Sequence, residues 1–117
     1  MRLITSQPDP HATLAPWKKP ATSASYVYLL ASSPYGTFYV GVTSDLVKRV
    51  WQHREGVVDG FTRVHGTTRL VWYEVHADIM EAIRREKLIK KWHRDWKVNL
   101  VQRMNPGWED LYDQTVG

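Results

Sequence analysis

The 117-residue sequence contains no cysteine, and this absence removes three kinds of chemistry at once. Disulfide bonds, thiolate metal sites and cysteine nucleophiles all require a thiol. The sequence also lacks any run of about 18 apolar residues, so we expect no membrane-spanning helix. Its first 20 residues contain four prolines and no apolar segment of signal-peptide length. These absences fit a reducing compartment, and we predict a cytoplasmic location.

The composition that is present indicates one small globular domain with a basic surface. Hydrophobic residues make up 43% of the chain and charged residues 24%, which is typical of a folded domain. A chain of 117 residues is long enough for one core of modest size. We expect residues 1–24 to form a flexible tail and residues 25–114 to form the domain. The net charge of +4 and the pI near 9.5 favour an anionic partner.

Residues 26–54 predict a β-hairpin followed by a helix. Two runs rich in Val, Tyr and Phe suit a pleated surface, and the Ser-Ser-Pro-Tyr-Gly sequence at residues 32–36 supplies turn residues between them. A turn centred near Ser33 and Pro34 places Tyr28 opposite Tyr39 and Tyr26 opposite Gly41. We therefore expect two phenols side by side on one face, with open space at Gly41 beside Tyr26.

The helix after the hairpin carries two more polar residues on one side. Ser44 or Asp45 can cap it, and Asp45, Arg49 and His53 recur at four-residue spacing. Leu46, Val47 and Val50 supply the packed side of this helix. Arg49 and His53 can thus share one surface with the two tyrosines. The alternative is that the tyrosines are ordinary strand residues and that Arg49 pairs with Asp45.

The second half of the chain predicts a third strand and two more helices. The strand covers Arg69–Val75, and Asp78 with Glu81 forms a capping-box-like start for a helix over residues 79–92. A second helix over residues 94–103 ends at the Asn-Pro-Gly sequence of residues 105–107. Two apolar residues beyond it are expected to attach the chain end to the core: Trp108 and Leu111.

Glu86 lies within the apolar side of the first of these helices, which otherwise consists of Ile79, Ala82, Ile83 and Ile89. A buried carboxylate is costly unless it is paired or binds a metal. One reading is an ion pair with Lys90 or Arg49. The other is a ligand for Mg²⁺ or Mn²⁺, which prefer carboxylate oxygen and often keep several waters.

Half of the 16 basic residues fall between residues 84 and 103, where only two acidic residues occur. Such a segment attracts polyanions, and its tryptophans, Trp92 and Trp96, are suited to stacking on bases. The alternative is a solvated helix face whose tryptophans pack inward. We predict that six of these basic residues contact nucleic acid: Arg84, Lys87, Lys90, Lys91, Arg94 and Lys97.

Taken together, these residues resemble the GIY-YIG endonuclease superfamily. The resemblance rests on Tyr26-Val27-Tyr28, Tyr39-Val40-Gly41, Arg49, His53 and Glu86, in this order on the expected elements. It extends from residue 26 to about residue 108 and is closest to the small, stand-alone bacterial members. The nuclease module of the excision-repair incision subunit is a more distant likeness. Two departures stand out: Tyr-Val-Tyr replaces Gly-Ile-Tyr, and Val42 stands where the excision-repair module has a lysine.

The resemblance implies an α+β fold in which helices flank a three-stranded antiparallel sheet, in the order β-β-α-β-α-α. It also implies metal-dependent endonuclease activity on DNA, with RNA as the alternative substrate and DNA repair or recombination as the setting. By position, Tyr28, Tyr39, Arg49, His53 and Glu86 are the implied catalytic residues, and Glu86 would bind one Mg²⁺ or Mn²⁺ ion.

Three questions stay open at the level of sequence. Either Tyr39 or His53 can be the general base. An imidazole titrates near pH 6.5, whereas a phenol has a pKa of about 10 and needs cationic neighbours or the metal to act as a base. The domain can also be a nucleic-acid-binding module without turnover, or an interaction domain that uses its aromatic residues. The oligomeric state is not predicted.

Overall fold

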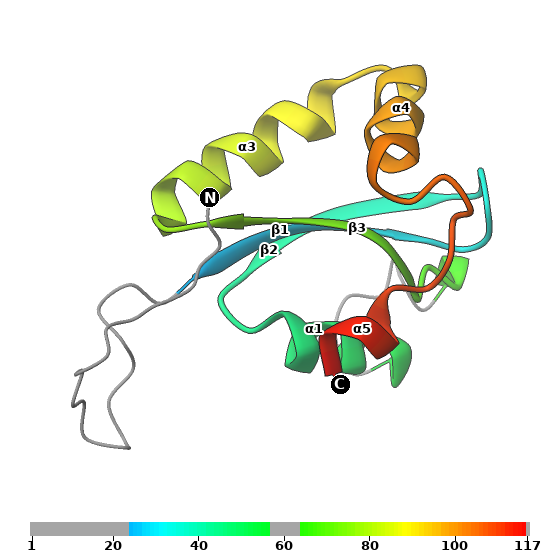
Figure 1. The fold of residues 1–117 in the computed structure, drawn as a ribbon, viewed down its shortest axis with the longest axis horizontal. Helices are drawn as coiled ribbons and strands as arrows, with labels where there is room; N and C mark the ends of the chain where they lie inside the picture. Colours follow the sequence, from blue (N-terminus) through cyan, green and yellow to red (C-terminus); the bar gives the residue numbers. More distant parts are fainter. Residues whose placement is uncertain (1–23, 57–63, 117) are drawn as a thin grey trace.

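A computed structural model describes residues 24–56 and 64–116 of the chain. Its centre is an antiparallel sheet of β1 (Ser25–Ala31), β2 (Phe38–Thr43) and β3 (Arg69–His76) in the order β2-β1-β3. Helices α3 (Ile79–Lys91) and α4 (Arg94–Met104) cover one face (Figure 1). Helices α1 (Leu46–Arg54) and α5 (Tyr112–Val116) cover the other face. The predicted α+β fold is confirmed, and α5 is an addition that the sequence did not predict.

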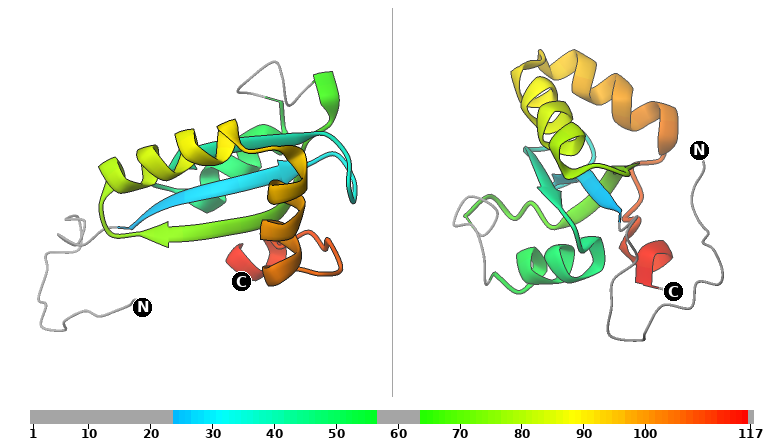
Figure 2. Two further views of the ribbon diagram at one scale, coloured as in Figure 1. Left: turned by 90° about the horizontal axis from the view of Figure 1, so that it is seen from above. Right: turned by 90° about the vertical axis from the view of Figure 1, so that its left-hand side faces the viewer.

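The central strand β1 is apolar on both sides because both sides are covered. Val27, Leu29 and Ala31 pack with α3 and α4, whereas Tyr28 and Leu30 pack with α1. Figure 2 shows the resulting layers from two further directions. Residues 1–23, which make up nearly all of the predicted tail, lie outside the described residues, so the predicted domain boundaries stay predictions.

The predicted strand register is wrong by two residues. Tyr28 pairs with Gly41, and Tyr26 pairs with Thr43. The turn is centred on Pro34 and Tyr35, one residue later than predicted, and Gly36 N donates to Ser33 O at 2.8 Å. Tyr35 has a φ of 59°, a left-handed conformation that few aromatic residues adopt. Every pairing therefore shifts by two positions.

Helix capping agrees with the sequence. Asp45 Oδ1 accepts a hydrogen bond from Lys48 N at 3.2 Å and begins α1. Asp78 Oδ1 accepts one from Met80 N at 2.9 Å and begins α3. Each cap satisfies an amide that the first helical turn would otherwise leave unpaired. These caps fix where the two helices leave the sheet.

The segment after α4 crosses from one face of the sheet to the other. Trp108 is buried in the core beneath α3 and α4, and Leu111 is buried in the core beneath α1, as predicted. Asn105 Nδ2 donates to Val71 O at 3.1 Å, and Asp110 Oδ1 accepts from Leu70 N at 3.2 Å. These bonds join the segment to β3 and hold α5 beside α1.

Candidate active site

A buried hydrogen bond joins Tyr28 on β1 to His53 on α1. The distance between Tyr28 Oη and His53 Nε2 is 3.0 Å, and the two residues are 0% and 1% exposed. The chain folds this way because Leu46, Val50 and His53 share one side of α1, which is the side buried against the sheet. A polar pair is thereby held rigidly inside an otherwise apolar interface.

Gly41 makes room for the Tyr28 ring. A β-carbon at position 41 would lie 2.4 Å from Tyr28 Oη and 2.5 Å from Tyr28 Cζ. No side chain other than that of glycine fits beneath this ring. The prediction of open space beside Tyr26 is wrong, because Tyr28 stands opposite Gly41 and occupies that space.

Tyr39 completes a cluster of three rings with Tyr28 and His53, which we call the ring cluster. Its ring centroid lies 6.3 Å from that of Tyr28 and 5.1 Å from that of His53. Tyr39 is partly exposed, whereas the other two residues are buried. Of the three, Tyr39 is therefore the one that a molecule in solvent can reach.

Arg49 lies one helical turn before His53 on α1 and is half-buried. Its side chain forms no ion pair with the described residues, and Asp45 instead caps the helix through Lys48 N. The structure thus does not contain the Arg49–Asp45 pair that was the alternative reading of the sequence. Residues at i and i+4 lie on the same side of a helix, so Arg49 borders the ring cluster through His53.

Glu86 lies on α3, the helix that covers the face opposite the ring cluster. It is 9% exposed, as its position among apolar residues predicted, and its Oε2 is 2.5 Å from Lys90 Nζ. The ion pair that was one of the two readings of Glu86 is therefore present. The structure brings Tyr28, Tyr39 and His53 together, but it places Glu86 in a different layer.

The chemistry of the Glu86 carboxylate suits a hard cation such as Mg²⁺ or Mn²⁺, which binds oxygen and keeps several waters. In the described part of the chain, no group of three or more His, Asp or Glu side chains is arranged to hold a metal ion. Glu86 would thus be a single protein ligand, with water and phosphate as the others. Lys90 would have to give up its contact with Oε2.

Three of the predicted nucleic-acid-binding residues form an exposed stripe on α3. Arg84, Lys87 and Lys91 recur at spacings of three and four residues, which places them along one side of the helix. None of the three forms an ion pair with the residues that the structure describes. We call Arg84, Lys87 and Lys91 the α3 basic stripe.

The other three predicted contacts are engaged within the protein. Lys90 pairs with Glu86. Arg94 donates to Tyr35 O, and to Gly36 O at 2.7 Å, so it fastens the hairpin turn to α4. Lys97 Nζ donates to Lys90 O at 3.5 Å, and burial, followed by the positive charge of Arg94, lowers the pKa of the Lys97 ammonium.

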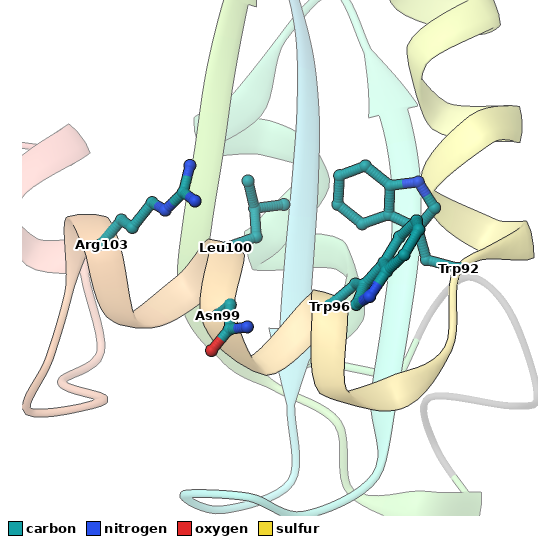
Figure 3. Close-up of a pocket in the computed structure, with 5 residues that line it drawn as sticks. All are labelled: Trp92, Trp96, Asn99, Leu100 and Arg103. Carbon is teal, nitrogen blue, oxygen red and sulfur yellow. The ribbon is translucent and has the colours of Figure 1, made fainter.

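A pocket of about 280 Å³ lies beside α4 and was not predicted as a unit. Its lining consists of Trp92, Trp96, Asn99, Leu100 and Arg103 (Figure 3). Both tryptophans and the basic segment stand out in the sequence, whereas Asn99 and Leu100 were not predicted as site residues. Helical spacing could have predicted this pocket, because residues 96, 99, 100 and 103 lie along one side of a helix.

Residues 24–99 match the family described as the GIY-YIG catalytic domain. The match covers more than half of the 117 residues, so the chain belongs to the GIY-YIG family. The matched range contains the ring cluster, Arg49 and Glu86. No helix of the described residues is long and apolar enough to cross a membrane.

Similar proteins carry the name UPF0213, which states no activity. A UPF0213 protein of Clostridium perfringens is 36% identical over 77 residues, covering 66% of this chain and 82% of the relative. One of Bacillus pumilus is 31% identical over 90 residues, covering 77% and 91%. The solution NMR structure of a UPF0213 protein of Bacillus halodurans is 32% identical, covers 74% of this chain and 92% of its own, and has a TM-score of 0.48.

Proposed function

We propose that this protein is a metal-dependent endonuclease that hydrolyses phosphodiester bonds in nucleic acid, with DNA preferred over RNA. The proposal includes a cytoplasmic role in DNA repair or recombination. The observation that carries it is the ring cluster: a buried Tyr28–His53 hydrogen bond of 3.0 Å beneath a partly exposed Tyr39, within the range that matches a catalytic domain.

Hydrolysis requires a group that accepts a proton from the attacking water and groups that stabilise the charge on the phosphoryl oxygens. In this proposal Tyr39 accepts the proton as a phenolate that has first lost its own proton to solvent, because Tyr28 and His53 are too deeply buried to meet a water at the phosphate. Tyr28 and His53 act as positioning residues that hold the Tyr39 ring from beneath. Arg49 contacts a non-bridging phosphate oxygen.

Glu86 would hold the divalent cation in this proposal. Such an ion, when bound, supplies charge stabilisation to a phosphoryl oxygen and to the leaving oxygen. Lys90 pairs with the Glu86 carboxylate in this structure, so a cation at Glu86 would take the place of the lysine ammonium. The single-carboxylate donor set fits Mg²⁺ or Mn²⁺ when phosphate supplies further oxygen ligands.

The first test is incubation of the protein with labelled single-stranded, duplex and branched DNA and RNA in Mg²⁺, Mn²⁺ or EDTA. We expect cleavage that EDTA abolishes.

The base assignment is tested by single-turnover cleavage between pH 6 and 10. We expect Tyr39→Phe to lower the rate by about 10² to 10⁴, the usual range for a lost general base, and His53→Ala to lower it less. A near wild-type rate for Tyr39→Phe together with an inactive His53→Ala would transfer the role of base to the histidine.

A second candidate function is a nucleic-acid-binding module without turnover, and the Glu86–Lys90 ion pair favours it. In that case Glu86 serves only as the ion-pair partner of Lys90 on α3. Glu86→Gln separates the two functions. For the nuclease, the wild type should cleave, and Glu86→Gln should lose cleavage and keep binding. For the module, neither protein should cleave, and the effect of Glu86→Gln should be limited to the stability lost with the ion pair.

A further inference from the structure

We infer that the pocket beside α4 binds one unpaired nucleobase, so that the preferred substrate is a nucleic acid with a single-stranded or extruded base. This inference rests on the proposed function in so far as the ligand is nucleic acid. It adds a second contact point to the ring cluster, on the opposite face of the sheet.

The stacking surface is the indole ring of Trp96. This residue is 56% exposed although it sits in a pocket wall, which is unusual for so large an apolar ring. Trp92 holds it edge-on, with ring centroids 5.8 Å apart and an interplanar angle of 76°. Trp92 is itself fixed, because it packs against the core and because the Arg85 guanidinium lies 5.4 Å from its ring centroid. Trp96 is therefore supported at its edge before any ligand arrives.

The remaining lining suits a planar base with a polar edge. Leu100 lies beside the two rings, and Asn99 and Arg103 follow along α4 (Figure 3). An amide can donate to and accept from the polar edge of a base, and a guanidinium can bind a phosphate or stack on a base. Every base has a π-face and can stack on an aromatic ring, so we expect the pocket to recognise unpaired bases without preference for their sequence.

The charges around the pocket favour a polyanion over an apolar peptide. Arg103 lines the pocket and Lys97 lies on the same helix, whereas Arg94 is bound to the hairpin turn on the other side of α4. A neutral peptide would leave these positive charges uncompensated.

The pocket adjoins the α3 basic stripe. Lys91, the last residue of the stripe, directly precedes Trp92 of the pocket lining, and both Lys91 and Trp96 are exposed. A strand whose base occupies the pocket can thus lay its phosphates along α3.

The inference is tested by fluorescence anisotropy with labelled oligonucleotides in EDTA, where cleavage cannot occur. Loss of one base stack weakens binding by about 5- to 150-fold, and we expect this loss for Trp96→Ala with a single strand or a bulged duplex. Trp96→Phe should retain part of the affinity. With a fully paired duplex, Trp96→Ala should change binding less than about twofold, since no unpaired base is offered.

Trp51→Ala is the matched control. Trp51 is also an exposed helical tryptophan, at 50%, but it lies on α1 on the other face of the sheet. Its replacement should leave single-strand binding within about twofold, as expected for a residue outside the contact. A second readout uses 2-aminopurine in place of one base: its fluorescence should fall on binding to the wild type and should not fall with Trp96→Ala.

Equal affinity of Trp96→Ala and wild type for single strands would overturn the inference and leave the proposed nuclease intact. Equal losses of affinity for single strands and for paired duplex would overturn it as well, because stacking on an unpaired base cannot contribute to binding of a paired duplex. Conversely, a selective loss of single-strand binding by Trp96→Ala supports the pocket even if the wild type fails to cleave in Mg²⁺, and in that case only the proposed nuclease is refuted.

Discussion

The replacement of Gly41 by alanine tests the geometry on which the ring cluster depends. The added β-carbon would lie 2.4 Å from Tyr28 Oη, 2.5 Å from Tyr28 Cζ and 3.0 Å from Tyr28 Cε2. Tyr28 is fully buried, so its ring cannot swing into solvent to avoid the contact. The ring must shift within a packed core, and its hydrogen bond to His53 must lengthen or break.

Two contributions set the expected loss of stability. Overpacking of a core by one carbon costs about 1–3 kcal/mol. Loss of a buried hydrogen bond such as that between Tyr28 and His53 adds about 1 kcal/mol. We therefore expect Gly41→Ala to lower the free energy of unfolding by roughly 2–4 kcal/mol. Without the steric contact the sign would reverse, because alanine in a strand interior is favoured over glycine by about 0.5–1 kcal/mol.

Urea unfolding monitored by circular dichroism measures this loss, and Gly107→Ala is the control. A β-carbon at Gly107 would meet its nearest atom at 3.5 Å, which is ordinary contact, so this variant should stay within about 0.5 kcal/mol of wild type. In a Tyr28→Leu background, Gly41→Ala should cost much less, because the ring is gone. A neutral or stabilising effect of Gly41→Ala in the wild type would refute the close packing of Tyr28 on Gly41.

Two further predictions concern charge. Replacement of the α3 basic stripe by alanine (Arg84→Ala, Lys87→Ala, Lys91→Ala) should make nucleic-acid binding less dependent on salt. The slope of log affinity against log salt concentration, measured by anisotropy between 50 and 300 mM salt, should fall by roughly 0.7–0.9 for each phosphate that these side chains neutralise. An unchanged slope would show that the stripe does not contact nucleic acid. Hydrogen bonds from Arg54 and from the amides of Tyr112 and Leu70 outweigh the effect of burial and lower the pKa of Asp110. A lowered folded-state pKa contributes stability above the unfolded value of about 3.9 and loses it at lower pH, so urea unfolding should separate wild type from Asp110→Asn at pH 6 and bring them together near pH 2.

Local signals in the sequence predicted the elements well because those signals have local causes. Asp78 begins α3, as expected for a short acceptor ahead of an apolar helical pattern, and α4 follows within three residues of the end of α3. The strand register failed because it depends on the turn, and the left-handed conformation of Tyr35 leaves no trace in residue type. Helix α5 has five residues, too few to produce a recognisable period.

The arrangement of the candidate site was only partly predictable. Helical and strand spacing predicted that Tyr28, Tyr39 and His53 would lie near one another, and they do. The same reasoning does not say which face of the sheet α3 covers, because a central strand that is apolar on both sides offers two equivalent faces. The position of Glu86 relative to the rings therefore had to come from the structure.

The separation of Glu86 from the ring cluster restricts where a single phosphate can meet both. Tyr39 lies on β2, which is an edge strand, and α3 packs over β1 and β2 from the opposite face. A direct line between the two faces passes through the packed core, which a phosphate cannot enter. A phosphate that contacted both Tyr39 and a cation held by Glu86, as proposed above, would consequently lie across the edge of β2.

A double-mutant cycle on cleavage decides whether the two residues serve one site in this way. Residues that act as a unit lose far less in combination than the product of their separate losses. We expect Tyr39→Phe to lower the single-turnover rate by about 10² to 10⁴ and Glu86→Gln by a comparable factor. The rate of the double variant should then be only slightly lower than that of the slower single variant. Urea unfolding of all three variants provides the control, since a shared loss of folding would imitate coupling. Losses that multiply would place Tyr39 and Glu86 in separate functions and would refute a phosphate bound across the edge of β2.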